Sequence, residues 1–196
     1  MKKSAPVFPV VLFLLFIFTS TAFAGQENDY FDSGYEKHLQ GDLKTAIRDY
    51  TKAIEKNPRF AMAYQMRGAA WQRMKVYDKA INDFSMVITF GEPHFLAVGY
   101  YNRGVVKNMS GDFFGAIADL SAALNLDGKM ATAFFHRGIA KGRTGDAFGR
   151  IEDFRAAAKL GDLNAEKWLN IYYPSWRQSV AAAPLPVPAP LPTPVQ

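Results

Sequence analysis

Apolar residues recur along the central part of the chain with the spacing of amphipathic helices. In the segment 61–74 they follow one another at steps of three and four residues, as Ala61, Tyr64, Gly68 and Trp71. The segment 77–88 has the same period, in Tyr77, Ala80, Ile81, Phe84 and Ile88. Such steps place side chains on one face of a helix. The pattern predicts helices of about 13 residues that each bury one face.

Turn-forming residues separate the predicted helices. Pairs of glycine and aspartate lie between two helical segments at three places, Gly41-Asp42, Gly111-Asp112 and Gly145-Asp146. Asn57-Pro58 closes the first pair of segments. Short connections of this kind predict antiparallel helical hairpins.

The hairpin pattern occurs four times along the chain. Four segments can be laid over one another, 34–58, 68–93, 104–128 and 138–162, and their first glycines are 34, 36 and 34 residues apart. A second landmark recurs inside each segment, at 46–50, 80–84, 116–120 and 150–154. One hairpin cannot bury its apolar stripe alone, so consecutive hairpins are expected to stack into a right-handed superhelix with a concave and a convex face.

The first glycines share one place in the repeat, and charged residues accompany three of them. Where two helices approach most closely, only glycine or alanine lets the backbones meet, so we expect a structural role for Gly34, Gly68, Gly104 and Gly138. An arginine precedes three of these glycines and an aspartate follows 16 residues after each arginine, as Arg67 and Asp83, Arg103 and Asp119, and Arg137 and Asp153. We predict ion pairs within each hairpin, worth about 0.2 to 1 kcal/mol each where they are partly exposed.

The four units resemble tetratricopeptide repeats (TPR), a family of 34-residue helical hairpins. The first unit carries the small residue, alanines, aromatic residue and proline of the family pattern at Gly34, Ala46, Tyr50, Ala53 and Pro58. The resemblance implies an all-α fold, a superhelical stack of four TPR helical hairpins at 27–60, 61–96, 97–130 and 131–162, with a C-terminal capping helix at 163–173. The related Sel1-like repeats are an alternative, but the 34-residue spacing favours the tetratricopeptide family.

Two units depart from the family pattern. The second unit has Val87 in place of an alanine, and its two extra residues near 92–96 are expected to lengthen a turn between repeats. The fourth unit has Arg150 in place of an alanine, so the packing of the last hairpin has to accommodate a cation. In the capping helix, Trp168 is interpreted as part of a lid over the apolar edge of the stack. The alternative is that Trp168 serves as a platform for a ligand.

The two ends of the chain lack the repeat pattern. Residues 1–24 are predicted to be a signal peptide, with Lys2 and Lys3, an apolar run at 10–18 and a small-x-small site at 22–24. An uncleaved anchor is the alternative, but the run is shorter than the roughly 18 to 20 residues of a membrane span. We therefore expect an exported bacterial protein, periplasmic or extracellular, without a stable membrane span after cleavage. Residues 174–196 are predicted to be a Pro-rich disordered tail of polyproline II character, either a linker or a ligand.

Composition excludes several classes of protein. The chain of 196 residues has no cysteine, which excludes disulfide-stapled domains and cysteine-ligated zinc or iron-sulfur modules. The net charge of +5 falls to +3 without Lys2 and Lys3, so it gives no argument for nucleic-acid binding. The three histidines are scattered and no catalytic or phosphate-binding motif is present. We predict a protein that is not an enzyme and needs no cofactor and no metal.

The resemblance implies that partners bind on the concave face, which the first helix of each hairpin builds. Carried over residue by residue, this face consists of Phe31, Tyr35, Met62, Gln65, Met66, Ala69, Tyr101, Asn102, Val105, Phe135, His136 and Ile139. Some family members grip a C-terminal carboxylate of a peptide with lysine and asparagine. This chain has Phe31 and Tyr35 at those places, so binding of chaperone tails is not expected. Val105 and Ile139 have an alternative role as residues buried between neighbouring hairpins.

The function expected from these observations is a protein–protein interaction scaffold. It would bind a peptide or helix of an envelope partner in the apolar, aromatic groove, as a monomer or with weak self-association. The alternative within the same architecture is an assembly factor or structural subunit of a periplasmic or membrane-associated complex.

Overall fold

The computed structural model describes residues 25–177, apart from the side chain of His94. This range contains helices and no strand: α2 (Gln26–Leu39), α3 (Leu43–Lys56), α4 (Ala61–Arg73), α5 (Tyr77–Phe90), α6 (Pro93–Ser110), α7 (Phe113–Leu126), α8 (Ala131–Arg143), α9 (Ala147–Lys159), α10 (Leu163–Tyr172) and a 3-10 turn, η1 (Pro174–Arg177). The predicted signal peptide and the chain after residue 177 lie outside the described residues.

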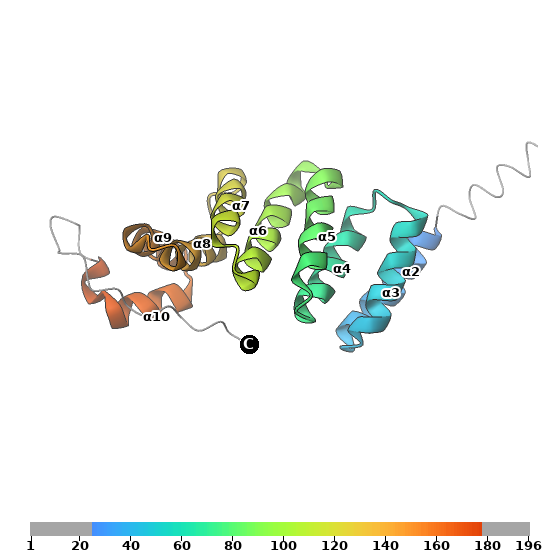
Figure 1. The fold of residues 1–196 in the computed structure, drawn as a ribbon, viewed down its shortest axis with the longest axis horizontal. Coiled ribbons are helices and arrows are strands. Elements are labelled where there is room, and N and C mark those ends of the chain that lie inside the picture. The colour runs from blue at the N-terminus through green and yellow to red at the C-terminus, as the bar shows by residue number, and fades with distance from the viewer. Residues whose placement is uncertain (1–24, 178–196) are drawn as a thin grey trace, which may run out of the picture.

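The helices pair in chain order. Hairpins form from α2 and α3, α4 and α5, α6 and α7, and α8 and α9, and each hairpin packs against the next one. Helix α10 packs against α9 and ends the series. Figure 1 shows the hairpins following one another in an elongated stack from α2 to α10. The expected fold class, an all-α stack of helical hairpins, is confirmed.

The glycine–aspartate pairs explain where the helices stop and start. Gly41, Gly111, Gly145 and Gly161 have φ between +82° and +95°, a conformation that ends a helix at little cost for glycine. The aspartate that follows each glycine accepts a hydrogen bond on its side chain from a backbone N–H three residues later, at 2.8 to 3.1 Å. Each dipeptide therefore closes one helix and caps the next. The second hairpin has Lys75 with φ of 61° in the glycine's place and no side-chain cap on α5.

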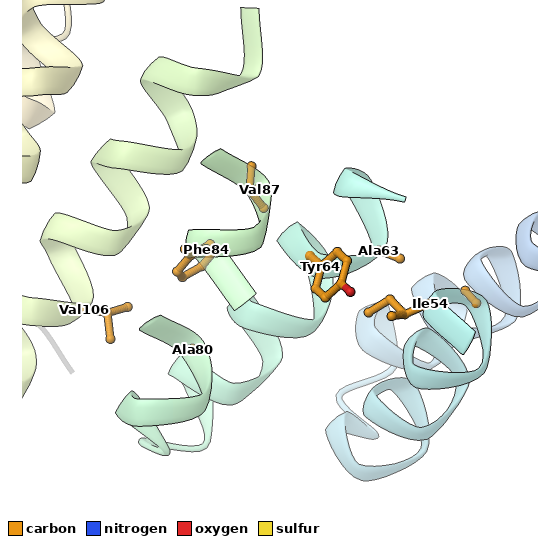
Figure 2. Close-up of a cluster of buried hydrophobic side chains, with 8 residues drawn as sticks. Ile54, Ala63, Tyr64, Ala80, Phe84, Val87 and Val106 are labelled. Atoms are coloured by element: carbon orange, nitrogen blue, oxygen red, sulfur yellow. The ribbon is translucent and has the colours of Figure 1, made fainter. Parts of the chain in front are cut away.

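The apolar core runs between the helices along the stack. In its N-terminal part, Ile54, Tyr64, Phe84 and Val106 belong to one buried cluster that joins three consecutive hairpins (Figure 2). The four first glycines lie against the largest buried side chains of their own hairpins. A Cβ atom added at these glycines would come within 2.6 to 3.0 Å of Tyr50, Phe84, Leu120 or Phe154. Their role in close helix packing, inferred from the sequence, is confirmed.

The three predicted ion pairs are present, and each is bidentate. Arg67, Arg103 and Arg137 donate through Nη2 to the paired aspartate at 2.7 Å, and through Nε at 2.8 to 2.9 Å. The aspartate side chains are almost fully buried, whereas the arginines keep about a fifth of their surface exposed. Lys107 and Lys141 add a second cation to Asp119 and Asp153, at 2.8 and 3.0 Å.

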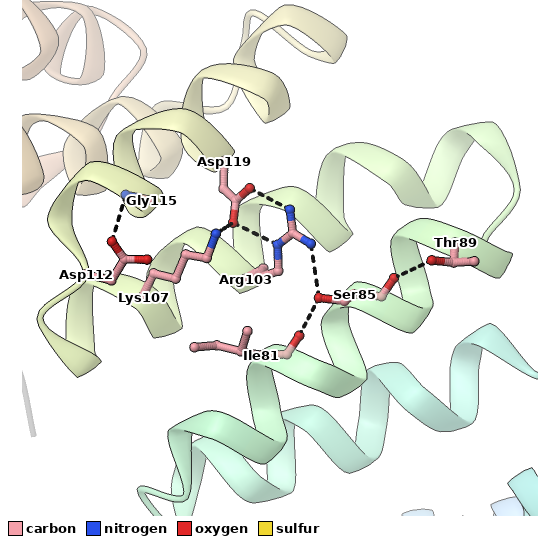
Figure 3. Close-up of polar contacts among 8 residues, drawn as sticks. All are labelled: Ile81, Ser85, Thr89, Arg103, Lys107, Asp112, Gly115 and Asp119. Atoms are coloured by element: carbon pink, nitrogen blue, oxygen red, sulfur yellow. Dashed lines mark hydrogen bonds and ion pairs between the residues drawn. The ribbon is translucent and has the colours of Figure 1, made fainter.

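The same arginines also connect each hairpin to the preceding one. Nη1 of Arg67, Arg103 and Arg137 donates to a hydroxyl of the preceding second helix, on Thr51, Ser85 and Ser121, at 3.0 Å each. Figure 3 shows the middle set, in which Ser85 also donates to the backbone oxygen of Ile81 at 2.7 Å. We call the three sets of arginine, aspartate and hydroxyl the arginine ladder. It ties all three junctions between hairpins in the same way.

The expectation that two extra residues lengthen a turn is wrong. Only Gly91 and Glu92 separate α5 from α6, whereas four residues separate α3 from α4 and α7 from α8. The insertion instead lengthens α6 to 18 residues, against 13 or 14 in the other first helices. Pro93 takes the first helical position, where its fixed φ and missing N–H favour a helix start. Because Gly99 has no side chain, α6 can approach Val87 and Ile88 of α5 closely.

Helix α10 covers the last hairpin. Trp168 is buried with its ring against Phe154 at 4.9 Å, and the guanidinium of Arg150 lies over the indole at 4.8 Å. The cation that replaces the expected alanine is therefore packed under the capping helix, and burial lowers its pKa. Because Trp168 is buried, the ligand-platform alternative lacks an accessible ring face.

The start of the predicted disordered tail needs correction. Residues Pro174–Arg177 form the 3-10 turn η1, and Trp176 is buried against α10. Its indole donates a hydrogen bond to Asn170 at 2.9 Å. The ordered chain therefore extends to residue 177, because an aromatic residue within the proline-rich segment finds an apolar site. Across residues 25–177, no helix has both the length and the apolar character that a membrane span requires.

Candidate functional site

The twelve residues predicted to bind a partner all lie on the first helices α2, α4, α6 and α8. Tyr35 is 44% exposed, and the other eleven are half-buried. First helices of neighbouring hairpins contact each other directly at α2 with α4 and at α6 with α8. We call these twelve residues the first-helix face.

The structure brings three of them together at the junction of α6 and α8. The ring of His136 lies 6.0 Å from that of Tyr101 and 5.6 Å from that of Phe135, measured between centroids and edge-on in both cases. Asn108 donates a hydrogen bond to the backbone oxygen of His136 at 2.8 Å and links the two helices. Burial lowers the pKa of His136, although the negative charge of Asp162 acts in the opposite direction. The imidazole is thus held neutral among aromatic rings at neutral pH.

A second aromatic pair lies at the N-terminal end. Phe31 and Tyr35 stack with centroids 6.5 Å apart. Phe31 also packs against Tyr50 and Phe60, at 5.7 and 5.2 Å, so that it forms part of the core. Tyr35 is the member of this pair that faces solvent.

Residues on α4 and the remaining residues of α6 lie between these two aromatic groups. They share partial burial and carry no charge: Met62, Gln65, Met66, Ala69, Asn102 and Val105. The side-chain oxygen of Gln65 is buried without a hydrogen-bond partner among residues 25–177. An unpaired buried acceptor costs free energy, so this amide is a weak point of the packing at α4.

Some predicted face residues also serve the core. Phe135 stacks on Phe154 at 5.2 Å, and Ile139 packs against the C-terminal apolar cluster. Ile139 therefore packs toward α9 of its own hairpin and toward α10, and the alternative role of Val105 and Ile139, burial between neighbouring hairpins, stays a prediction. The first-helix face is accordingly a half-buried surface, with its aromatic rings anchored in the hairpins beneath.

Sequence reasoning missed residues one turn further along the same helices. Asn108 bonds the backbone of α8, and Met109 is exposed beside Gln72 of α4, whose amide lies 3.6 Å from the sulfur atom. The three- and four-residue steps that select Tyr101 and Val105 continue to Asn108 and Met109, so periodicity would have found both.

The first-helix face offers apolar packing surface and hydrogen-bonding groups. Among the described residues, no three histidine, cysteine, aspartate or glutamate side chains are grouped so that they would hold a metal ion. The buried aspartates of the arginine ladder are committed to their arginines, as described above. What remains on the first-helix face is apolar area, two amides and aromatic rings.

Comparison with known sequences shows relatives that cover part of the chain. No family model matches it. A TPR repeat-containing thioredoxin of Arabidopsis thaliana is 36% identical over 87 residues, which is 44% of this chain and 22% of that protein. Hsc70-interacting protein 1 of Drosophila melanogaster is 38% identical over 88 residues, 45% of this chain and 23% of that protein. Human serine/threonine-protein phosphatase 5 is 31% identical over 101 residues, 52% of this chain and 18% of that protein. The chain spans about a fifth of the length of these relatives.

Comparison with solved structures identifies the fold. A crystal structure of MamA has a TM-score of 0.67 at 20% identity and covers 82% of this chain and 100% of that chain. The first TPR of Spaghetti (RPAP3), bound to the HSP90 peptide SRMEEVD, has a TM-score of 0.58 at 19% identity and covers 61% of this chain and 94% of that one. Together with the repeat-containing relatives, these likenesses show that the chain has the tetratricopeptide-repeat fold.

Proposed function

We propose that this protein is a non-enzymatic scaffold that binds a peptide or helix of a partner protein on its first-helix face. The observation that carries the proposal is the row of half-buried, uncharged aromatic and methionine side chains along α2, α4, α6 and α8. Aromatic and methionine side chains supply large contact area at modest entropic cost. Tyr101, Asn102 and Gln65 add hydrogen-bonding groups on which an extended or helical segment would be positioned.

The comparisons support a role in protein–protein interaction. One relative is named for interaction with Hsc70, and one structural neighbour holds a peptide. The relatives named as a thioredoxin and a phosphatase match over only about a fifth of their length, so their activities are not carried over. The peptide in the neighbouring structure is acidic at its end, SRMEEVD. Phe31 and Tyr35 offer no cation for such a peptide, and we therefore propose an apolar segment as the ligand.

The proposed partner resides in the cell envelope. This part of the proposal rests on the basic and apolar pattern of residues 1–24, which is typical of a signal peptide. The uncharged character of the first-helix face fits a partner that presents the apolar side of an amphipathic helix.

The test is affinity capture with crosslinking from the cell envelope of the source organism. The full chain is compared with a double variant, Tyr101→Ala with Asn102→Ala, and with a matched control, Phe114→Ala with Phe148→Ala. The control residues are exposed phenylalanines on the second helices α7 and α9. Loss of one captured protein from the Tyr101 and Asn102 variant alone supports binding on the first-helix face.

Two other outcomes would change the proposal. Loss of the partner from the Phe114 and Phe148 variant alone would move the interface to the second helices and favour an assembly or structural subunit. Equal capture by all three proteins would reject the first-helix face as the binding surface. Far-UV circular dichroism of each variant shows whether its helices are intact.

A further inference from the structure

Three exposed leucines lie at the edge where second helices end. Leu126 is the last residue of α7 and Leu160 follows the last residue of α9, 34 residues further on, so the two are equivalent in adjacent repeats. Leu163 is the first residue of α10. Their exposed fractions are 52%, 43% and 75%. We call them the leucine strip. The first repeat has Lys56 at the equivalent place and the second has Phe90, which is half-buried, so the exposed leucines belong to the C-terminal half of the stack.

The chain turns back along α10 before it leaves the described range. Trp176 and Arg177 both donate hydrogen bonds to the side-chain oxygen of Asn170, at 2.9 Å each. Arg177 also donates to Glu166, one turn nearer the start of α10. Since Leu163, Glu166 and Asn170 follow one another at steps of three and four residues, they share one face of the helix. Residues 173–177 therefore run antiparallel to α10, and their direction leads to Leu163.

Residues 178–196 have a composition that matches an apolar docking surface. The segment 178–196 contains no charged side chain, and Leu185, Val187 and Leu191 alternate with prolines. A proline-rich segment in polyproline II geometry has no internal hydrogen bonds and advances about 3.1 Å per residue, so residues 178–191 reach roughly 40 Å. Packed helices are about 8 to 10 Å apart, and the contacts from α10 to α7 pass through α9 and α8, so the strip spans roughly 30 Å at most. The segment is long enough to reach all three leucines.

We propose that residues 184–194 dock on the leucine strip of their own chain. The direction of the chain at Arg177 delivers the segment to Leu163. Its prolines, leucines and valine then cover Leu160 and Leu126, and its preset extended backbone loses little entropy on docking. The segment acts as a continuation of the C-terminal cap, and the first-helix face stays open for a partner. The inference does not depend on the proposed function, because it concerns a different surface.

The absence of cysteine makes a paramagnetic test direct. A single substitution, Ala189→Cys, carries a nitroxide label in the full chain, and leucine and methionine methyl signals are recorded by NMR with the label oxidised and reduced. We expect a selective loss of signal intensity at Leu126, Leu160 and Leu163. Leu39 is the control, because it is a leucine with 71% exposure on α2, at the other end of the stack.

A second variant tests the strip itself. In the labelled chain, Leu160→Asp with Leu163→Asp should restore the signal of Leu126, whereas Leu39→Asp should leave its loss unchanged. Uniformly intact leucine signals, or a loss at Met62 and Met66 on the first-helix face instead, would overturn the proposal. A loss that appears only when labelled and unlabelled copies are mixed would also overturn it, because it would show a second copy as the occupant.

Discussion

The two ends of the stack avoid an exposed apolar edge in opposite ways. Inside the stack, each first helix presents small or apolar residues to the preceding hairpin, and Ala63, Ala70, Ala133 and Ala140 are fully buried there. At the equivalent places, α2 has Asp29 and Glu36, both exposed. The N-terminal end thus lacks the apolar surface that another hairpin would need.

The C-terminal end keeps its apolar surface and covers it. Helix α9 buries Ile151, Phe154 and Ala157 against α10, and Trp168 and Trp176 complete that cluster. The arginine ladder shows the same asymmetry. The first hairpin has Ser33 where later ones have arginine, and Ser33 donates to Asp49 at 3.0 Å. The last hairpin has Arg155 where earlier ones have a hydroxyl, and its guanidinium lies 5.0 Å from the ring of Tyr173. One end is closed by charge and the other by aromatic cover.

The largest effect is expected where aromatic cover is removed. Trp168→Ala opens a cavity under α10 and exposes Arg150, and it should lower the free energy of unfolding by about 3 to 5 kcal/mol. Urea denaturation followed by circular dichroism measures the change. Ile171→Ala on the exposed side of the same helix is the control and should cost less than about 1 kcal/mol. Equal costs for the two variants would contradict the capping role of Trp168.

A smaller but still large effect is expected when one ladder arginine is removed. Arg67→Met leaves the buried carboxylate of Asp83 without its ion pair and should cost about 3 kcal/mol in the free energy of unfolding. The matched change in the first hairpin, Ser33→Ala, should cost about 1 kcal/mol, because Arg48 still lies 3.3 Å from Asp49. Thermal and urea denaturation measure the loss of stability in both variants. If Ser33→Ala costs as much as Arg67→Met, the ladder does not distinguish the two regions.

Acid should weaken the ladder at Asp119. Burial raises the pKa of this carboxyl, but hydrogen bonds from Arg103 and Lys107 outweigh burial, and the net pKa lies below its ordinary value. The unfolded chain therefore binds the proton more readily than the folded one. The stabilisation is present above the unfolded pKa of about 3.9 and is lost as the pH falls through the folded pKa. Urea midpoints measured across this acid range should fall less steeply for Asp119→Asn than for the unaltered protein. Parallel slopes would reject the assignment.

The smallest change in stability is expected at the N-terminal end. Asp29→Ala with Glu36→Ala should alter the free energy of unfolding by less than about 1 kcal/mol, since both side chains are exposed. It would, however, give α2 the small apolar residues of an internal helix. We expect concentration-dependent association in sedimentation velocity, with Asp32→Ala as the control. An unchanged sedimentation coefficient would show that charge at these two places does not close the end.

Periodicity and fixed offsets allowed much of the fold to be predicted. The arginine–aspartate pairs followed from the offset of 16 residues, because a hairpin with a short turn places such residues opposite each other. Their hydroxyl partners, such as Ser85, were not predicted, since the distance between hairpins depends on superhelical geometry. The lengthened α6 was missed although Pro93 is a signal for a helix start, because an insertion in sequence does not reveal whether a turn or a helix absorbs it.

The site was predicted less completely than the fold. The twelve residues do lie on the first helices, but sequence alone did not show that Phe31 and Phe135 are anchored in the core while Tyr35 faces solvent. That division depends on the packing of Tyr50 and Phe154 from second helices. Trp176 was assigned to the disordered tail because the proline-rich segment was taken to begin at Pro174. Whether an isolated aromatic residue finds a pocket depends on tertiary structure.

For the proposed binding on the first-helix face, the long helix α6 has a consequence for how a segment would be aligned. An array of similar repeats has near-translational symmetry, so a segment that fits one pair of hairpins could shift by one repeat and meet a nearly identical surface. The first turn of α6, beginning at Pro93, interrupts that symmetry at one junction. A segment that crosses this junction would have one alignment in which it meets the additional turn. The insertion would thus fix the register of a bound segment along the repeats.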